Sequence, residues 1–406
     1  MQKQSTSIFN IAVIVAALGY FVDIYDLLLF QIVRLPSLKS LGLTEDAADK
    51  SGQFIISVQM TGLLIGGIIW GIMGDKKGRL SVLFGSIVLY SIANIFNGFV
   101  HSVNEYATVR FFAGIGLAGE LGAGITLVSE LVHKDKRGVS TSLVAGIGLT
   151  GAVVAYFISR EFDWRICYFI GGGLGLCLLV LRVAVFESGM YKQVKESKVS
   201  RGNFTMFFTS AKRFKKYIFS ILIGLSTWYV IGVLIAFSNK FGKEFGLTEK
   251  INPGKATMYA YIAISIADVL IGFVSQWLKS RKKALYIFYA ITIVMLVLYF
   301  TQSHTNASTM YWIIAGLGFG TGFWAIFVTM AAEQFGTNLR ATAATTVPNM
   351  VRGSLPLTIL LFNSLQNYFS YVTSGWITGL VIMTVSVIAA ALSEETFGKD
   401  LNYVEE

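Results

Sequence analysis

A small set of ionisable side chains lies within stretches of sequence that are otherwise apolar. They are Asp23, Asp26, Arg110, Glu120, Arg182, Asp268, Glu333 and Arg352. Burying such a charge in a membrane-like environment costs roughly 2.5–3.5 kcal/mol or more, unless the group finds a partner, water or a change of protonation. Groups of this kind can carry a proton, bind a charged substrate or hold two segments together. They are therefore the first candidates for function.

Asp26 and Arg110 are expected to meet. Asp26 lies eight residues before Arg34, where we expect its helix to end, and Arg110 lies six residues after Asn104, where a helix of opposite direction begins. At about 1.5 Å per residue, these depths are about 12 and about 9 Å. A carboxylate paired with arginine stays ionised, whereas the same group in a drier site without the cation favours its neutral form. The pair is either a proton switch or a static ion pair that fixes helix packing. Asp23, one turn earlier on the same face, is the second candidate for the proton.

Glu120 follows three glycines, Gly114, Gly116 and Gly119, whose missing side chains allow another helix to approach closely. Its carboxyl could carry a proton or bond to that neighbouring helix.

Arg352 lies between Pro348 and Pro356, which interrupt helical hydrogen bonding and can open a helix toward a cavity. Its guanidinium can donate two parallel hydrogen bonds to a carboxylate and keeps its charge. We expect Arg352 to bind a substrate carboxylate; the alternative is a salt bridge with Asp268 or another acid in the spans. Further residues are expected to line the cavity, with packing or interface anchoring as the alternative. They are Tyr25, Trp228, Tyr229, Trp324 and Asn349.

The composition indicates a polytopic membrane protein. Hydrophobic residues make up 54% of the 406 residues, charged residues only 14%, and the mean hydropathy is +0.64, more apolar surface than a soluble domain could bury. The net charge of +10 comes from short basic loops rather than from one face, so it indicates orientation in a lipid bilayer and no nucleic-acid partner. The three His and two Cys residues are scattered. We therefore expect no metal site, no cofactor other than a proton as coupling ion, and no enzyme activity.

Twelve apolar runs of about 20 residues are each long enough to cross a bilayer as a helix. They lie near residues 8–34, 52–73, 79–100, 104–132, 138–159, 165–186, 217–238, 256–278, 283–301, 308–332, 340–366 and 371–393. Roughly two thirds of the 33 Lys and Arg residues fall on the side that holds both chain ends. This asymmetry predicts a protein of the bacterial inner membrane with both termini cytoplasmic.

The chain divides into two halves of similar organisation. Residues 130–137 close the fourth span and open the fifth, and residues 333–340 do the same for the tenth and eleventh, 203 positions later. The basic segment between the halves contains Phe204, Phe207 and Phe208, which predicts either a short interfacial amphipathic helix or a linker without regular structure. We predict an all-α membrane protein with an N-terminal six-helix bundle (1–190), a linker (191–216) and a C-terminal six-helix bundle (217–406). The site should lie between the bundles near mid-membrane.

Several motifs give the chain a family resemblance. Residues 71–79 (Gly-Ile-Met-Gly-Asp-Lys-Lys-Gly-Arg) resemble the loop between the second and third helices of major facilitator superfamily transporters, and we expect a tight turn there with Gly74 and Gly78 at positive φ. Four further stretches resemble signatures of the sugar porters and of the related metabolite/proton symporters and organic-ion transporters. They are residues 110–120, Glu130 with 136–138, Arg182 with 187–188, and the tail 394–401.

Two departures from the family pattern favour an organic metabolite over a sugar. The matching loop of the second half, residues 279–283, lacks the expected Gly and Asp, and the sixth span does not end in the Pro-Glu-Ser-Pro-Arg motif of sugar porters. The resemblance implies the fold of two pseudo-symmetric six-helix bundles. It also implies that Asp26 matches an Asp that faces the Arg of the fourth helix, here Arg110, until it is protonated. The region of Arg352 matches one that supplies a cation to the substrate carboxylate in organic-anion transporters.

Charges near the inner ends of the spans are expected to lie in one plane. They could form an interhelix ion-pair network that closes the cytoplasmic side when the cavity faces outward, or they could be solvated loop charges. They are Asp75, Arg79, Glu130, Arg137, Glu187, Glu333, Arg340 and Glu395.

We predict from these features a secondary active transporter, a monomer, that moves a small anionic metabolite with protons by alternating access. Uptake of a neutral sugar or zwitterion, or export of drugs or metabolites, remains an alternative within transporters. A membrane substrate sensor is a different class, for which an added cytoplasmic domain or a long signalling tail would be expected.

Overall fold

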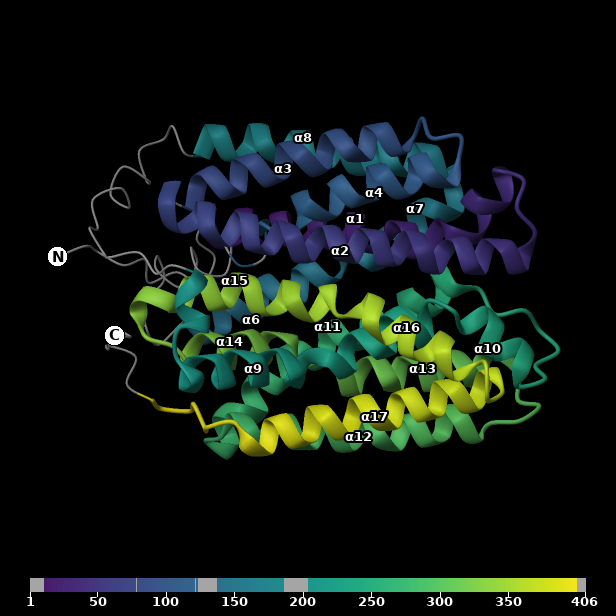
Figure 1. Cartoon of the computed structure of the whole chain (residues 1–406). Coiled ribbons are helices and arrows are strands. Elements are labelled where there is room, and N and C mark those ends of the chain that lie inside the picture. Colours follow the sequence, from purple (N-terminus) through teal and green to yellow (C-terminus); the bar gives the residue numbers. More distant parts are fainter. Residues whose placement is uncertain (1–10, 78, 121, 123–136, 186–203, 400–406) are drawn as a thin grey trace.

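The structure is a computed structural model that describes residues 11–77, 79–120, 122, 137–185 and 204–399. Its helices run side by side along one axis and form two bundles, which are stacked one above the other in Figure 1. Among the described residues the regular structure is entirely helical. The all-α prediction is therefore confirmed.

The N-terminal bundle follows the first six predicted spans. Its helices are α1 (Ile11–Ser40), α2 (Glu45–Lys77), α3 (Arg79–Asn97), α4 (Val103–Leu117), α6 (Arg137–Leu149) continued by α7 (Gly151–Glu161), and α8 (Trp164–Val185).

The C-terminal bundle follows the other six. Its helices are α9 (Ala211–Tyr229), continued by the π-helical segment η5 (Val230–Ile235) and by α10 (Ser238–Glu244), then α11 (Pro253–Leu278), α12 (Arg281–Thr301), α13 (Ala307–Thr321) continued by α14 (Trp324–Glu333), α15 (Thr337–Gly353) continued by α16 (Leu355–Leu365), and α17 (Tyr371–Leu392).

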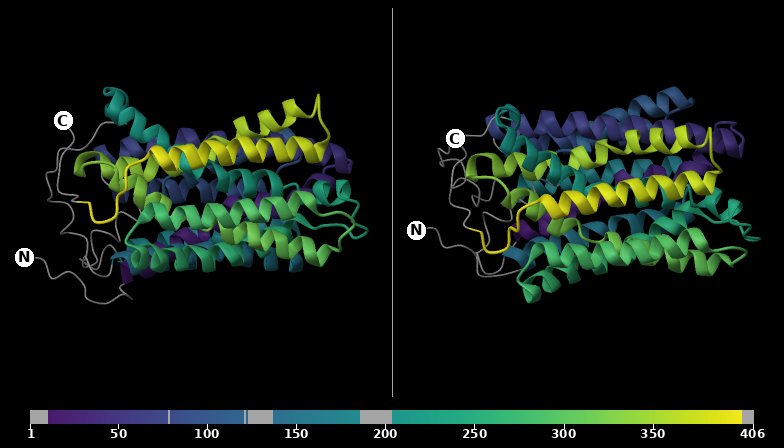
Figure 2. Two further views of the ribbon diagram at one scale, coloured as in Figure 1. Left: turned by 90° about the horizontal axis from the view of Figure 1, so that it is seen from below. Right: turned by 60° about the horizontal axis from the view of Figure 1, so that its bottom comes forward.

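Figure 2 shows α1 starting and α17 finishing at the same end of the molecule. We call this the inner end, after the orientation that the basic loops predict, and the opposite end the outer end. The junctions between α2 and α3 and between α11 and α12 both lie at the inner end (Figure 1). The two matching junctions of the two halves therefore lie at the same end of the molecule, as the sequence predicted.

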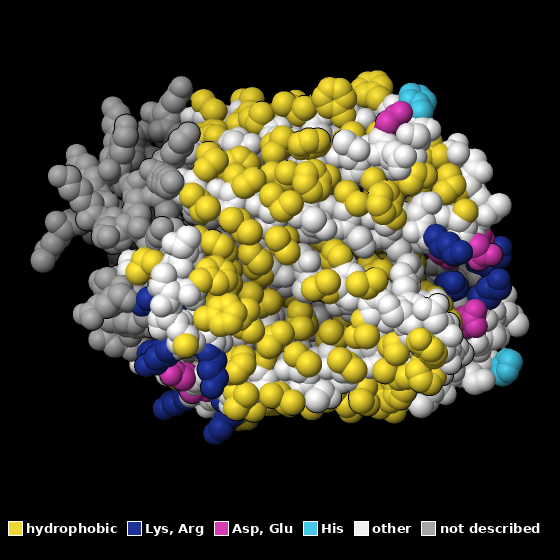
Figure 3. All heavy atoms as spheres, viewed as in Figure 1, with side chains coloured by type: hydrophobic (Ala, Val, Ile, Leu, Met, Phe, Trp, Pro, Cys, Tyr) yellow, Lys and Arg dark blue, Asp and Glu magenta, His cyan; other side chains and the backbone are white. Residues whose placement is uncertain are grey.

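The surface and the helix lengths fit a bilayer. A broad band of hydrophobic side chains covers the visible face, and charged side chains gather at its ends (Figure 3). By length and composition, nine helical stretches of the described residues could each cross a membrane. The other three predicted spans correspond to α3, whose apolar part Ser81–Asn97 is shorter, to α4, whose continuation lies largely outside the described residues, and to α15 and α16, which are divided at Ser354.

Several helix ends differ from the predicted ones. α1 continues to Ser40, six residues past Arg34. Arg34 is fully buried, and the turn that follows the helix contains Gly42, with φ 87°. α2 is helical through Gly74 to Lys77, so Gly74 lies in the helix and has no positive φ, while Gly78 lies outside the described residues. These ends extend beyond the apolar runs because a backbone near lipid keeps its hydrogen bonds by remaining helical.

The fourth and tenth spans break at equivalent positions. α4 ends at Leu117 and Gly119 lies in a turn, while α13 ends at Thr321 and Gly322 separates it from α14. Gly119 and Gly322 are 203 positions apart, the spacing of the two halves. The bundles meet where α2 packs against α15 and α16, and where α11 packs against α1, α6 and α7.

The described part of the linker ends in a short 3-10 helix, η4 (Phe204–Phe208). Phe207 is buried and stacks on Tyr217 with ring centroids 4.4 Å apart, while Phe208 is exposed. α9 begins at Ala211, six residues before the predicted seventh span. These residues therefore attach the linker to the inner end of the C-terminal bundle.

Candidate functional site

The predicted contact between the first and fourth spans is present. Arg110 Nη1 donates a hydrogen bond to Asp26 Oδ1 at 2.9 Å, and Arg110 Nη2 donates to the Asp26 carbonyl at 3.0 Å. Both side chains are fully buried. The same guanidinium donates to Gln59 on α2 at 3.2 Å and to Asn94 on α3 at 3.3 Å. Arg110 therefore joins four helices of one bundle. The other carboxylate oxygen of Asp26, Oδ2, receives no hydrogen bond from the described residues.

Asp23 lies one turn further inward on α1 and has a different environment. Its side chain is fully buried, and neither carboxylate oxygen has a hydrogen-bond partner among the described residues. Arg352, on the other bundle, is close enough to interact with it electrostatically. Asp23 is thus an acid at the bundle interface without a donor of its own.

Glu120 forms a second buried ion pair within the N-terminal bundle. Arg182 on α8 donates to it through both terminal nitrogens, with Nη1 3.0 Å from Oε2. A side chain at Gly19 would collide with both partners, so α1 packs directly on the pair. Of the two roles expected for Glu120, the contact with a neighbouring helix is observed; a role in proton transfer stays a prediction.

Arg352 lies in a buried region that faces the N-terminal bundle. It lies on α15 with 1% of its surface exposed, and its guanidinium carbon is 5.8 Å from the ring centroid of Trp228 and 5.6 Å from that of Trp324. Its hydrogen bond to Asn349 is long, at 3.5 Å. Among the described residues no carboxylate forms a salt bridge with it, and its Nε, Trp228 Nε1 and Trp324 Nε1 all lack acceptors. Arg352 and the two indoles thus place three unsatisfied donors in one buried region.

Asp268 does not pair with Arg352, which was the alternative expected for this arginine. Its Oδ1 accepts a hydrogen bond from the backbone N–H of Ala325 at 2.7 Å, so it caps the first turn of α14 after the break at Gly322. A carboxylate at this position also suits the positive end of a helix dipole. The hydrogen bond at the start of α14 therefore accounts for a buried carboxylate at position 268.

The remaining predicted cavity residues serve packing in this conformation. Asn349 donates to the carbonyl of Ala118 at 2.8 Å and so connects α15 to the end of α4 across the bundle interface. The Tyr25 hydroxyl donates to the Cys167 carbonyl at 2.9 Å, and the Tyr229 hydroxyl donates to the Gly375 carbonyl at 2.5 Å. Each tyrosine hydroxyl is therefore used within its own bundle.

The described charges at the inner end form a network within the C-terminal bundle. Glu333 accepts from Arg281 at 3.3 Å and from the Thr396 hydroxyl at 2.7 Å. Glu395 accepts from the Ser280 hydroxyl and from the backbone N–H of Arg281. Burial opposes ionisation of Glu395, but these hydrogen bonds outweigh it and hold the pKa of this carboxyl below its usual value.

Most of the other predicted gate residues have side chains outside the described part of the chain. Arg340 lies on α15 and donates to the Phe335 carbonyl at 3.5 Å. Asp75, Arg79 and Arg137 lie at helix ends, but their side chains are outside the described part, as are Glu130 and Glu187 altogether. A cytoplasmic gate that joins the bundles stays a prediction.

Two buried tyrosines near Arg352 were not among the residues predicted from the sequence. Tyr20 on α1 and Tyr261 on α11 are buried and interact electrostatically with it. Their signal is weak, because a tyrosine in an apolar span is usually a packing residue. Arg34 was also missed, since it was taken as the solvent-exposed end of the first span.

Comparison with known proteins identifies the family of the chain. The family model of the Major Facilitator Superfamily matches residues 6–353. The niacin transporter NiaP of Acinetobacter baylyi is 25% identical over 96% of this chain and 95% of its own length. The gentisate transporter of Corynebacterium glutamicum is 23% identical over 82% of this chain and 76% of its own length.

A solved structure supports the architecture. The proton:xylose symporter XylE, bound to 6-bromo-6-deoxy-D-glucose, matches with a TM-score of 0.70 and 18% identity, over 98% of both chains. At this identity the likeness concerns the fold, and it supports twelve helices in two bundles. The matches do not point to an enzyme. The chain therefore belongs to the major facilitator superfamily and is a multi-pass membrane transporter.

Proposed function

We propose that this transporter moves a small organic anion together with protons through the bacterial inner membrane, with both termini cytoplasmic. The observation that carries the proposal is the buried group formed by Arg352, Trp228 and Trp324. A buried guanidinium without a hydrogen-bonded carboxylate and buried N–H groups without acceptors are both unfavourable. An anionic ligand would supply the missing charge and acceptors at once.

A ring-bearing carboxylic acid fits the chemistry of this region. The guanidinium can donate two parallel hydrogen bonds to a carboxylate, and the indoles offer flat apolar surfaces for a ring. The relatives named for niacin and gentisate carry such acids, which supports this substrate class over a sugar.

We propose Asp23 as the acid that couples transport to protons. Without substrate, Arg352 is the cation that can balance the Asp23 charge across the interface. A bound substrate anion takes over that cation and leaves Asp23 as an unpaired charge in a dry site, unless it binds a proton. Substrate anion and proton therefore enter the site together. Asp26, the first candidate from the sequence, already has the Arg110 hydrogen bond within its own bundle.

Uptake into proteoliposomes tests the proposal. The panel contains nicotinate and gentisate, the uncharged nicotinamide as a matched neutral compound, xylose, and inorganic phosphate to separate a carboxylate site from a general anion site. We expect accumulation of at least one carboxylic acid when the outside is more acidic, and no accumulation of nicotinamide or xylose. Transport of neutral compounds only would contradict the proposal.

A further inference from the structure

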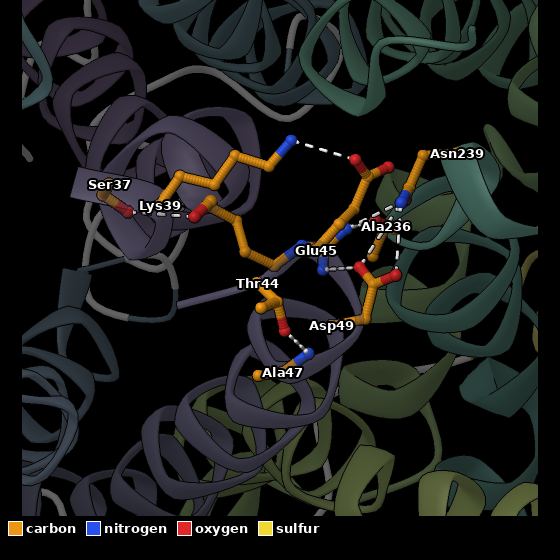
Figure 4. Close-up of polar contacts among 9 residues, drawn as sticks. Ser37, Lys39, Thr44, Glu45, Ala47, Asp49, Ala236 and Asn239 are labelled. Carbon is orange, nitrogen blue, oxygen red and sulfur yellow. Dashed lines mark hydrogen bonds and ion pairs between the residues drawn. The ribbon is translucent and has the colours of Figure 1, made fainter. Parts of the chain in front are cut away.

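A second buried polar cluster lies at the outer end, between the bundles and away from Arg352. It consists of Arg34 on α1, Asp49 on α2 and Asn239 on α10, together with the carbonyl of Ala236. Figure 4 shows Asp49, Ala236 and Asn239 close together. Arg34 is fully buried and Asp49 is 5% exposed. We call this cluster the outer latch.

The outer latch contains bonds of two kinds. Arg34 Nη1 and Asp49 Oδ1 are 2.5 Å apart, and this ion pair lies within the N-terminal bundle. Arg34 Nη2 donates across the interface to the Ala236 carbonyl at 2.9 Å and to Asn239 Oδ1 at 3.0 Å. Asn239 Nδ2 returns hydrogen bonds to both oxygens of Asp49 at 3.3 Å. Separation of the bundles would therefore keep the ion pair and break the bonds to Ala236 and Asn239.

Local backbone geometry makes these bonds possible. The seventh span passes through the π-helical segment η5 and stops at Phe237 before α10 begins. At this break the Ala236 carbonyl accepts from Arg34, and the Phe237 ring lies 4.5 Å from the guanidinium carbon. On the other side, Gly52 leaves the space that Arg34 fills, since a Cβ there would be 2.5 Å from Arg34 Cδ.

The outer latch also lies at a boundary. A pocket of about 750 Å³ at the outer end includes Asp49 and Asn239 in its lining. One turn inward on α1, Gln31 donates to the Ile231 carbonyl at 3.0 Å and to Thr257 at 3.4 Å. Thr257 is fully buried and outside that lining. Gln31 also lines this pocket, so the latch and Gln31 together lie between the outer space and the buried Thr257.

We infer that Arg34, Asp49 and Asn239 form the outer gate of the transporter. The inter-bundle bonds from this cluster hold the outer side closed, and their rupture opens the pocket to the interior. The retained Arg34–Asp49 pair keeps both charges neutralised on the N-terminal bundle while the gate is open. The inference rests on the family's alternating access and not on the identity of the substrate.

Thiol labelling of Thr257→Cys tests the gate. A charged, membrane-impermeant methanethiosulfonate reagent is added to the outer side of right-side-out vesicles, and the protein without Thr257→Cys gives the background of Cys167 and Cys177. Asn239→Ala should raise the labelling rate about tenfold, the factor expected when the closed state loses a charge-assisted hydrogen bond. Gly52→Ala, which displaces Arg34 from the opposite bundle, should act in the same direction.

Asn363→Ala is the matched control. Asn363 donates across the same interface to Gln53 at 2.8 Å, but the bond is exposed to solvent, so its loss should change the rate less than about twofold. Labelling of inside-out vesicles from the inner side should not rise, whereas a generally loosened protein would react faster from both sides. Unchanged outer labelling in both latch variants, or an equal rise with Asn363→Ala or from the inner side, would overturn the gate. No substrate is needed, so this failure would leave the proposal of anion transport standing.

Discussion

Removal of the charge should lower the free energy of unfolding strongly at one buried arginine of this transporter and hardly at all at another. Arg110 and Arg352 are 0% and 1% exposed, but Arg110 has a carboxylate and two amide oxygens as partners, whereas Arg352 has one long bond to Asn349. Arg110→Met leaves Asp26 as an unpaired buried charge, for which a loss of about 3–5 kcal/mol is expected. Arg352→Met breaks no hydrogen-bonded salt bridge and removes a costly buried charge. Asp23, whose charge Arg352 balances only through space, can bind a proton instead. We expect its free energy of unfolding to stay within about 1 kcal/mol of the wild type or to increase.

The free energies of unfolding can be measured in detergent micelles by denaturant titration, with both variants purified in parallel. Met keeps much of the volume of the arginine stem, so the comparison isolates the charge and its hydrogen bonds. The reasoning is refuted if Arg352→Met is destabilised as much as Arg110→Met. Arg352 would then be a structural cation and not a group held ready for a ligand.

Three further changes follow from the same contacts. Asp23→Asn should abolish accumulation driven by a pH gradient but preserve exchange of labelled for unlabelled substrate, and loss of exchange as well would point away from a coupling role. Arg352→Lys keeps the charge but loses the parallel hydrogen bonds, so the KM for the acid should rise about tenfold; an unchanged KM would exclude bidentate binding. Glu395→Gln should lower stability at pH 7 but not below about pH 3, because a carboxyl with a depressed pKa contributes stability above its unfolded pKa and loses it on protonation; equal losses at both pH values would contradict this.

Much of the fold could be predicted because the bilayer restricts it. A span needs about 20 apolar residues, and this requirement located the twelve spans, while the matching segments 130–137 and 333–340 gave the repeat of 203 positions. The same regular rise along a helix allowed Asp26 and Arg110 to be matched in depth before any contact was known. The contact is present although α1 continues six residues past its predicted end at Arg34.

The partners of the other buried charges could not be predicted, because they depend on which helices are neighbours. Arg182 pairs with Glu120 from a different span, and Asp268 caps a helix whose break at Gly322 is a tertiary feature. Arg34 was assigned to the membrane surface because it ends an apolar run. The structure instead places it in a helix that continues to Ser40 and buries it against the other bundle. Apolar runs thus indicate where a helix can cross lipid, and they do not show which charges face protein.

The most direct test of the account is movement of protons by the substrate. Proteoliposomes that enclose a pH-sensitive dye receive the transported acid from outside, and protein-free liposomes correct for passive entry of the neutral acid. We predict acidification of the lumen by the wild-type protein, none with nicotinamide, and no acidification above the passive level with Asp23→Asn. Uptake of labelled acid without any protein-dependent acidification would contradict the claim that the organic anion and the proton cross together.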